Sequence, residues 1–327
     1  MSADVPASVP GPQSAERTRS DGRLHAAIFI VLGAFLLIAP GLFYPFFLMK
    51  LLCFALFACA FNLLLGYGGL LSFGHAAFFG SASYVSAHAA KIWGLPPELA
   101  ILTGTLSAGV LGLVFGALAI RRQGIYFAMV TLAFAQMIYF VALQAPFTGG
   151  EDGIQAVPQG RMFGFIDLSN MTTLYYVVCV IFMLGVLAIY RIVHSPFGQV
   201  LKAIRDNEPR AISLGYRTDR YKLAVFVLSA TLAGLAGATK AIVVQLASLT
   251  DVYWAMSGEV VLMTLLGGMG TIFGPMAGAA IIITMQNYFA GFGAWVTVAQ
   301  GVVFVIAVLA FREGIVGIVA KWLRRPL

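Results

Sequence analysis

The sequence predicts an all-α polytopic membrane protein with about nine or ten membrane segments, including broken or re-entrant helices. Of its 327 residues, 60% are hydrophobic and only 10% are charged, and the mean hydropathy is +0.92. Apolar runs of about 17–25 residues recur along the chain, which is the length that an α-helix needs to cross a bilayer. The runs are continuous, whereas the strands of a membrane barrel alternate polar and apolar residues in segments of about ten. This composition excludes a soluble domain of the same length.

The apolar runs are interpreted as membrane segments one by one. The stretch 257–311 is too long for two ordinary spans and is broken by glycines at 267–274 and 291–293. We therefore divide it into a short half-helix, either crossing or re-entrant, and two further spans. The predicted segments are 24–43, 46–65, 71–90, 99–120, 125–145, 172–190, 223–249, the half-helix 258–266, 275–290 and 294–311.

Basic residues set the predicted orientation, because cytoplasmic connections of membrane proteins are enriched in Lys and Arg. With the N-terminus inside, the cytoplasmic pieces carry 3, 2, 7 and 4 basic residues, which is 16 of the 20 in the chain. The net charge of +7 is therefore a sign of topology and implies no nucleic-acid partner. The other basic residues are Lys50, Lys91 and Arg161 in outside connections and Lys240 within a span, and the acidic residues expected outside are Glu98, Glu151, Asp152, Asp167 and Asp251.

The chain is expected to form one transmembrane domain between two cytoplasmic tails. Residues 1–22 are rich in Ala, Ser, Pro and Arg and are predicted to be a disordered tail. They lack the short apolar stretch and cleavage site of a signal peptide, so the first span is expected to act as an uncleaved anchor. The transmembrane domain covers 23–315, and a basic tail covers 316–327.

The predicted cytoplasmic loop 193–222 is a long hydrophilic stretch between two apolar runs, and it predicts two short helices. Asn207 is a good N-cap for the second helix, Pro209 fits its first turn and Gly215 is a natural stop. A small, folded, amphipathic projection on the cytoplasmic face is suited to binding a soluble partner. The alternative is a solvated loop whose basic residues reflect only the positive-inside rule. The residues expected to form the apolar face of the second helix are Ala211, Ile212 and Leu214.

A weak internal repeat marks two breaks in the apolar sequence. Residues 68–74, Gly-Gly-Leu-Leu-Ser-Phe-Gly, resemble residues 267–274, Gly-Gly-Met-Gly-Thr-Ile-Phe-Gly, with one residue inserted. Transport proteins often place paired broken helices at the substrate path, where free backbone groups face water instead of lipid. Close helix packing through small residues is the alternative for each glycine. The pathway candidates at the breaks are Gly68, Gly69, Ser72, Gly74, Gly267, Gly268 and Gly270.

Three ionisable side chains in the apolar sequence complete the candidate pathway. His75 follows the first break and either faces the path or bonds a neighbouring helix in the interior. Lys240 is costly within a membrane span and is therefore a functional candidate, which pairs with Glu259 or meets a substrate carboxylate. Snorkelling or a structural ion pair is the alternative for Lys240.

The sequence carries no motif for catalysis or for ATP binding. It lacks the Gly-x-x-x-x-Gly-Lys-Ser/Thr loop that binds phosphate. Its four histidines have no metal-ligand spacing, and Cys53, Cys59 and Cys179 lie in apolar runs, as expected of small buried residues. We therefore expect no enzymatic activity, no metal site and no cofactor on this chain.

The residues around the breaks and the loop carry a family resemblance. Residues 62–80, Asn-Leu-Leu-Leu-Gly-Tyr-Gly-Gly-Leu-Leu-Ser-Phe-Gly-His-Ala-Ala-Phe-Phe-Gly, resemble the signature of the Liv-type (Liv/HAAT) ABC importer permeases for branched-chain amino acids. Further stretches match in the family's order at 148–153, at 195–198 running into 205–208, and at 265–275. The loop 195–215 makes the resemblance closer to the LivM-like than to the LivH-like subunit.

The resemblance implies a permease subunit of an ATP-driven importer in the bacterial inner membrane. Its implied partners are a LivH-like second permease, two LivG/LivF-like ATPase subunits that bind ATP and Mg, and a periplasmic substrate-binding protein. The loop 193–222 would be the ATPase-coupling element, with its apolar residues entering a groove and Arg205 and Arg210 meeting acidic groups. The expected coupling residues are Arg205, Asn207, Glu208, Arg210, Ala211, Ile212, Leu214 and Gly215.

Other functions are left open by the sequence. The same family includes permeases for urea, short amides and other amino acids. A cation-coupled secondary transporter also uses repeats and broken helices, but it usually needs intramembrane acids, and Glu259 is the one candidate. A membrane-embedded enzyme has nothing specific in its favour.

Overall fold

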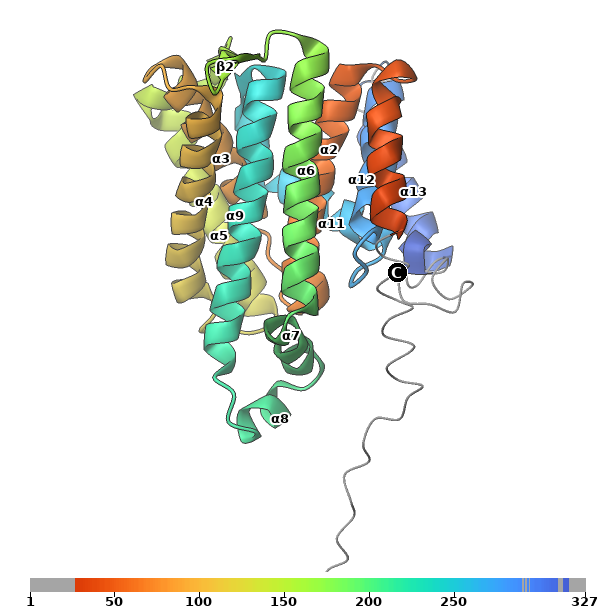
Figure 1. Ribbon diagram of the computed structural model, residues 1–327. Helices are drawn as coiled ribbons and strands as arrows, with labels where there is room; N and C mark the ends of the chain where they lie inside the picture. Colours follow the sequence, from red (N-terminus) through yellow and green to blue (C-terminus); the bar gives the residue numbers. More distant parts are fainter. Residues whose placement is uncertain (1–26, 290, 292, 294, 311–313, 318–327) are drawn as a thin grey trace, which may run out of the picture.

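The computed structural model describes residues 27–289, 291, 293, 295–310 and 314–317. This part of the chain is a helix bundle with two short sheets at one end and two short helices at the other (Figure 1). The predicted all-α membrane fold is confirmed; the tail 1–22 and residues 318–327 lie outside the described part. The helices are Ala27–Gly41, α2 (Pro45–Asn62), α3 (His75–Lys91), α4 (Pro97–Ala119), α5 (Ile125–Gln144), α6 (Met171–His194), α7 (Pro196–Asp206), α8 (Glu208–Ser213), α9 (Thr218–Val244), α10 (Leu249–Val252), α11 (Trp254–Gly267), α12 (Gly274–Tyr288) and α13 (Trp295–Ala310).

Five helices of the described part are long and apolar enough to cross a bilayer. The first is α2 together with a π-helical turn, Leu63–Tyr67, that continues it. Three shorter apolar helices, Ala27–Gly41, Trp254–Gly267 and Trp295–Ile306, accompany them. How many of these segments cross the membrane stays a prediction. The five long spans are Pro45–Tyr67, Pro97–Ala119, Ile125–Gln144, Met171–His194 and Thr218–Val244.

At three segments the difference from the predicted bounds has a local backbone cause. The segment predicted at 71–90 begins at His75, because the chain before it is an irregular break in which Gly69 has a φ of +68°. The segment predicted at 223–249 runs from Thr218 to Val244, because Gln245 adopts a left-handed conformation that ends α9. The half-helix predicted at 258–266 is the longer helix α11, which starts directly after the extended residue Tyr253.

Helix α9 is the central helix and packs on α2, α3 and α4. Small residues allow this close approach. A Cβ added at Gly112 of α4 would lie 2.5 Å from the Cβ of Ala230, and one added at Gly234 would lie 2.3 Å from the Cβ of Ala108. The outward face of α4 instead carries large exposed apolar residues such as Val110. Small residues inside and large apolar residues outside are typical of a membrane bundle.

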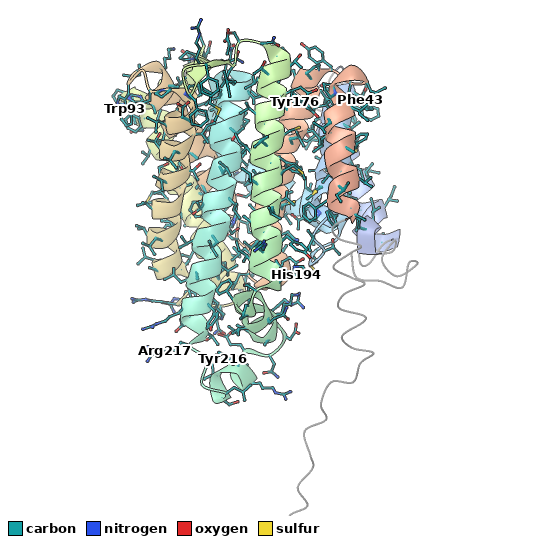
Figure 2. All side chains as sticks on the ribbon, viewed as in Figure 1. Phe43, Trp93, Tyr176, His194, Tyr216 and Arg217 are labelled. Carbon is teal, nitrogen blue, oxygen red and sulfur yellow. The ribbon has the colours of Figure 1, made fainter. Side chains whose placement is uncertain are left out.

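The two ends of the bundle differ in character. At one end, which we call the sheet end, strand β1 (Ile154–Gln155) pairs antiparallel with β4 (Leu246–Ala247), and β2 (Arg161–Met162) pairs with β3 (Ile166–Asp167). The exposed aromatic residues Phe43, Trp93 and Tyr176 lie toward this end (Figure 2). Helices α7 and α8 form the opposite end, which we call the loop end, where Tyr216 and Arg217 lie (Figures 1 and 2).

Candidate functional site

The loop 193–222 folds into two short helices, as predicted. Helix α7 starts at Ser195, whose hydroxyl accepts a hydrogen bond from the backbone N–H of Gly198 at 3.3 Å. Helix α8 starts at Asn207, whose Oδ1 accepts from the backbone N–H of Arg210 at 3.0 Å. Gly215 follows with a φ of +88°, a conformation that favours glycine. The structure therefore has the cap expected at Asn207 and the stop expected at Gly215.

The apolar residues of α8 do not share one face. Ala211 is buried at 3% exposure, whereas Ile212 and Leu214 are 55% and 70% exposed. The prediction of a common face is wrong, because α8 is a short helix that rests on α9 and buries only the residue that points toward its support. Tyr216 beside them is also exposed. Ile212, Leu214 and Tyr216, called the α8 tip below, present apolar surface at the loop end.

Glu208 binds its own chain. Its Oε1 accepts a hydrogen bond from Lys222 Nζ of α9 at 2.5 Å, and its Oε2 accepts from Gln123 Nε2 at 3.4 Å. The Lys222 side chain is only 6% exposed, so this ion pair is largely shielded from water. Helix α8 is thereby fastened to α9 and to the turn between α4 and α5. Arg210, by contrast, is exposed.

Arg205 also points toward its own chain. Its Nε and Nη2 donate to Asp206 Oδ1 at 3.0 and 2.9 Å, and its Nη1 donates to the carbonyl oxygen of Gly66 at 2.5 Å. Lys202 Nζ lies 5.5 Å from the centre of the Tyr67 ring. Partial burial lowers the pKa of Lys202, and the positive charge of Arg205 adds to this effect. Arg205 was expected to meet acidic groups of an ATPase, but in this structure it holds α7 against the end of α2.

The second break predicted from the repeat lies against the end of α2, just before the first break. Asn62 at the end of α2 donates from Nδ2 to the carbonyl oxygen of Thr271 at 2.8 Å, and its Oδ1 accepts from the backbone N–H of Gly270 at 2.9 Å. Both backbone groups belong to the second break. Asn62, Gly66, Gly270 and Thr271 are called the break junction below, because they join the end of α2 to the segment between α11 and α12.

In both breaks, a hydroxyl side chain accepts a hydrogen bond from a backbone N–H at the start of the next helix. Ser72 Oγ accepts from the backbone N–H of Gly74 at 3.2 Å, directly before α3. Thr271 Oγ1 accepts from the backbone N–H of Gly274 at 3.1 Å, at the start of α12. Each hydroxyl satisfies an N–H group that the beginning of a helix leaves unpaired. The weak sequence repeat therefore corresponds to two helix starts of similar construction.

The candidate glycines serve mostly to bring segments together. A Cβ added at Gly267 would lie 1.8 Å from the carbonyl oxygen of Gly274, and one added at Gly74 would lie 2.9 Å from the carbonyl oxygen of Thr131 in α5. Gly69 has a φ of +68°, and a Cβ there would lie 2.8 Å from Arg205 Cγ. These positions pack backbone against backbone or against a side chain, as in the alternative considered from the sequence. Gly268 and Gly270 also have positive φ angles, and Gly68 borders the cavity beside Arg205.

His75 lies in the packed core between α2, α3 and α9, with 0% exposure. Its Nε2 lies 2.8 Å from Ser229 Oγ, and the Ser229 hydroxyl donates to the carbonyl oxygen of Ala60. Since that hydroxyl proton is already used, Nε2 of His75 must be the donor to Ser229. The rings of Phe61, Phe78 and Phe226 surround the imidazole edge-on. His75 thus faces neighbouring helices and does not line an open path in this structure.

Lys240 pairs with Asp251, and the expected pairing with Glu259 is wrong. Lys240 Nζ lies 2.6 Å from Asp251 Oδ2, and the two side chains are 7% and 3% exposed. Asp251 also accepts from the backbone N–H of Ser248, which caps α10. Asp251 lies in the connection between α9 and α11, at the sheet end as predicted, but its carboxylate turns inward and neutralises the lysine.

Glu259 instead accepts a hydrogen bond from Gln286 Nε2 of α12 at 2.9 Å. Lys50 lies within electrostatic range of Glu259, Asp251 and Lys240. It is the sixth residue of α2 and half-buried, so its assignment to an outside connection is wrong. Lys50, Lys240, Asp251 and Glu259 thus form a group of charges contributed by α2, α9, α10 and α11.

Four residues that organise these sites were not among the site candidates taken from the sequence: Asn62, Asp251, Gln286 and Tyr216. Asn62 and Gln286 are polar residues inside apolar runs, and that exception to the pattern was the available signal. The position of Asp251, eleven residues after Lys240, did not indicate that the two side chains pair. They meet only because the turn between them folds the chain back toward α9.

Comparisons with known proteins show the family of the chain. A model of the family described as "Branched-chain amino acid transport system / permease component" matches residues 44–311. The chain is similar to the high-affinity branched-chain amino acid transport system permease protein LivM of Escherichia coli (strain K12), with 27% identity over 78% of this chain and 65% of that protein. It is 26% identical to LivM of Salmonella typhimurium over the same shares, so the match spans about two thirds of the length of each relative. No solved structure matches the chain. Because the family match covers most of its length, the chain is a multi-pass membrane protein that belongs to the permease components of the branched-chain amino acid transport systems.

Proposed function

We propose that the chain is the permease subunit of an ATP-driven importer for branched-chain amino acids, delivered by a periplasmic binding protein. The observation that carries the proposal is the α8 tip. Ile212 and Leu214 are more than half exposed on a capped helix that is braced by the Glu208–Lys222 ion pair. A rigid apolar projection at the loop end is suited to insertion into a groove of a soluble partner.

The proposed partner at this surface is an ATPase subunit. The sequence has no phosphate-binding loop, so ATP and Mg would be bound by two LivG/LivF-like subunits. Arg210 is exposed on the same helix and is available to acidic groups around such a groove. A LivH-like second permease would complete the transmembrane part, and no cofactor is assigned to this chain itself.

The proposed location is the bacterial inner membrane, with the loop end and both termini in the cytoplasm. Seven of the 20 basic residues fall between 191 and 222, which supports this orientation through the positive-inside rule. The sheet end would then face the periplasm and the binding protein. The substrate path is proposed to run past the exposed side of α11, where Glu259, Gln286 and Lys50 are partly accessible.

The test is to purify the complex with its partner subunits, place it in liposomes and supply the binding protein loaded with one ligand at a time. Leu, Ile or Val should stimulate ATP hydrolysis and uptake together. Stimulation by urea, a short amide or another amino acid instead would change the substrate. Uptake that needs a cation gradient and no ATP would make the chain a secondary transporter and refute the proposal.

A further inference from the structure

Arg205 connects the loop end to both helix breaks. Its Nη1 donates to the carbonyl oxygen of Gly66 at 2.5 Å, and the same nitrogen lies 3.7 Å from the point where a Cβ of Gly270 would stand. Its Cγ lies 2.8 Å from the corresponding point on Gly69. The side chain therefore leaves α7, passes over the first break and ends beside the second.

The break junction is packed tightly enough to move as a unit. A Cβ added at Gly66 would lie 2.2 Å from Asn62 Oδ1 and 2.5 Å from the backbone nitrogen of Gly270. Asn62 holds the second break with two hydrogen bonds, to Gly270 and Thr271. Because packed interiors transmit displacement and do not absorb it, a shift of Gly66 is passed to Gly270 and Thr271, directly before α12.

The Arg205 side chain is partly exposed and lies beside open space. Two of the three nitrogen atoms of the guanidinium are bound by Asp206, and the Arg205 side chain is 38% exposed. A cavity of about 420 Å³ borders Arg205, Gly68 and Gln123. This space allows the side chain to swing away from Gly66 while it keeps its bond to Asp206.

We propose that Arg205 is the positioning residue through which movement of α7 and α8 is transmitted to the two helix breaks, and so to the substrate path. This inference rests on the proposed importer function. It removes Arg205 from the surface that contacts the ATPase and gives it a role inside the permease. Binding of the ATPase at the α8 tip and transmission of the resulting movement would then depend on different residues.

The test uses the full complex in liposomes, with its binding protein and a branched-chain amino acid, and measures amino acids imported per ATP hydrolysed. In Arg205→Ala, the ATPase subunits should co-purify at wild-type ratio and basal ATP hydrolysis should persist. Import per ATP should fall about tenfold, the order expected for losing a hydrogen bond to a charged group. Arg205→Lys keeps a positively charged hydrogen-bond donor on a long side chain. It should recover much of the wild-type ratio of import to ATP hydrolysis. Arg217→Ala, which removes an exposed positive charge from the same loop, should keep the wild-type ratio.

Two results overturn the assignment of Arg205 while leaving the importer function in place. One is loss of the ATPase subunits from Arg205→Ala, which would make Arg205 a contact of the partner. The other is an unchanged ratio of import to hydrolysis in that variant. If the wild-type complex neither hydrolyses ATP in response to the loaded binding protein nor imports its ligand, the importer function fails and the inference fails with it.

Discussion

The buried pair of Lys240 and Asp251 illustrates what a single charge requires in this fold. An ionised side chain in an apolar interior is costly unless an opposite charge lies at hydrogen-bond distance. The 2.6 Å contact, with both side chains less than 10% exposed, meets that requirement. Lys240 is therefore best explained as half of a structural ion pair that fixes α10 against α9.

Replacing one member of this pair should destabilise the protein. Lys240→Met leaves the Asp251 carboxylate buried without its partner, which costs about 3–5 kcal/mol. We expect the apparent unfolding temperature of the purified protein in detergent to drop clearly, and Asp251→Asn should act in the same direction.

The double variant Lys240→Met with Asp251→Asn is the matched control. Neither side chain then carries a charge, so most of the lost stability should return. A double variant that is no more stable than Lys240→Met would contradict the pairing, as would a wild-type unfolding temperature for the single variant.

Replacing a glycine by alanine should lower stability where the glycine allows close backbone packing, and should not where the Cβ position is open. Gly66→Ala would force a Cβ to within 2.2 Å of Asn62 Oδ1, whereas Gly258 in α11 has nothing within 4 Å of its Cβ position. We expect Gly66→Ala to lower stability by about 1–3 kcal/mol through overpacking. Gly258→Ala should be neutral or stabilising, because alanine favours the helix. Thermal unfolding of the two variants, measured side by side, checks both expected changes in stability. Equal changes would contradict the close packing of the break junction.

At the scale of the element, α7 and α8 divide two tasks. Helix α7 contacts the membrane bundle through Arg205 and Lys202, while α8 presents the exposed Ile212 and Leu214. Because Arg205 bonds α7 to Gly66 and the Glu208–Lys222 ion pair bonds α8 to α9, both helices are positioned before any partner binds. A preorganised projection loses less entropy on binding than a flexible loop.

Charges on the α8 tip should therefore prevent ATPase binding without harming the permease. Ile212→Asp with Leu214→Asp places two carboxylates where an apolar groove is expected, and an unpaired buried charge costs several kcal/mol. We expect normal accumulation in the membrane, loss of the ATPase subunits on purification and no uptake.

The conservative pair Ile212→Met with Leu214→Met keeps the apolar surface and should retain the ATPase subunits. Full uptake and intact complexes in the Asp variant would exclude the α8 tip as the binding surface. Quantifying the permease in membranes before purification separates lost binding from lost folding.

Much of the architecture could be predicted from the sequence, because apolar length and charge bias act locally. The caps at Asn207 and Gly215 and the two breaks follow from residue type and spacing. The partners of Lys240, Arg205 and Asn62 could not be predicted in the same way. Each bonds a group that only the tertiary fold brings near, across as many as 209 residues for Asn62. Ala211 was misplaced because a six-residue helix has no lasting periodicity from which to choose a face.

At the scale of the whole molecule, the two ends of the bundle carry different chemistry. The loop end has Arg217 and the other basic residues of the 193–222 loop, and the sheet end carries Glu151, Asp152 and exposed aromatic residues such as Trp93. Basic residues are retained on the cytoplasmic side of a membrane during insertion, and Trp and Tyr favour the interface. The charge asymmetry thus supports the proposed orientation, with α8 in the cytoplasm and the sheets outside.

Labelling of single cysteines tests this orientation. Glu151 at the sheet end and Ser213 at the loop end are both exposed, whereas Thr148 nearby is only 2% exposed and would label poorly. The buried residues Cys53, Cys59 and Cys179 are first replaced by Ala. Glu151→Cys should react with an impermeant maleimide in intact spheroplasts, and Ser213→Cys should react only after lysis. The reverse pattern would invert the topology and place α8 on the wrong side of the membrane for a cytoplasmic ATPase.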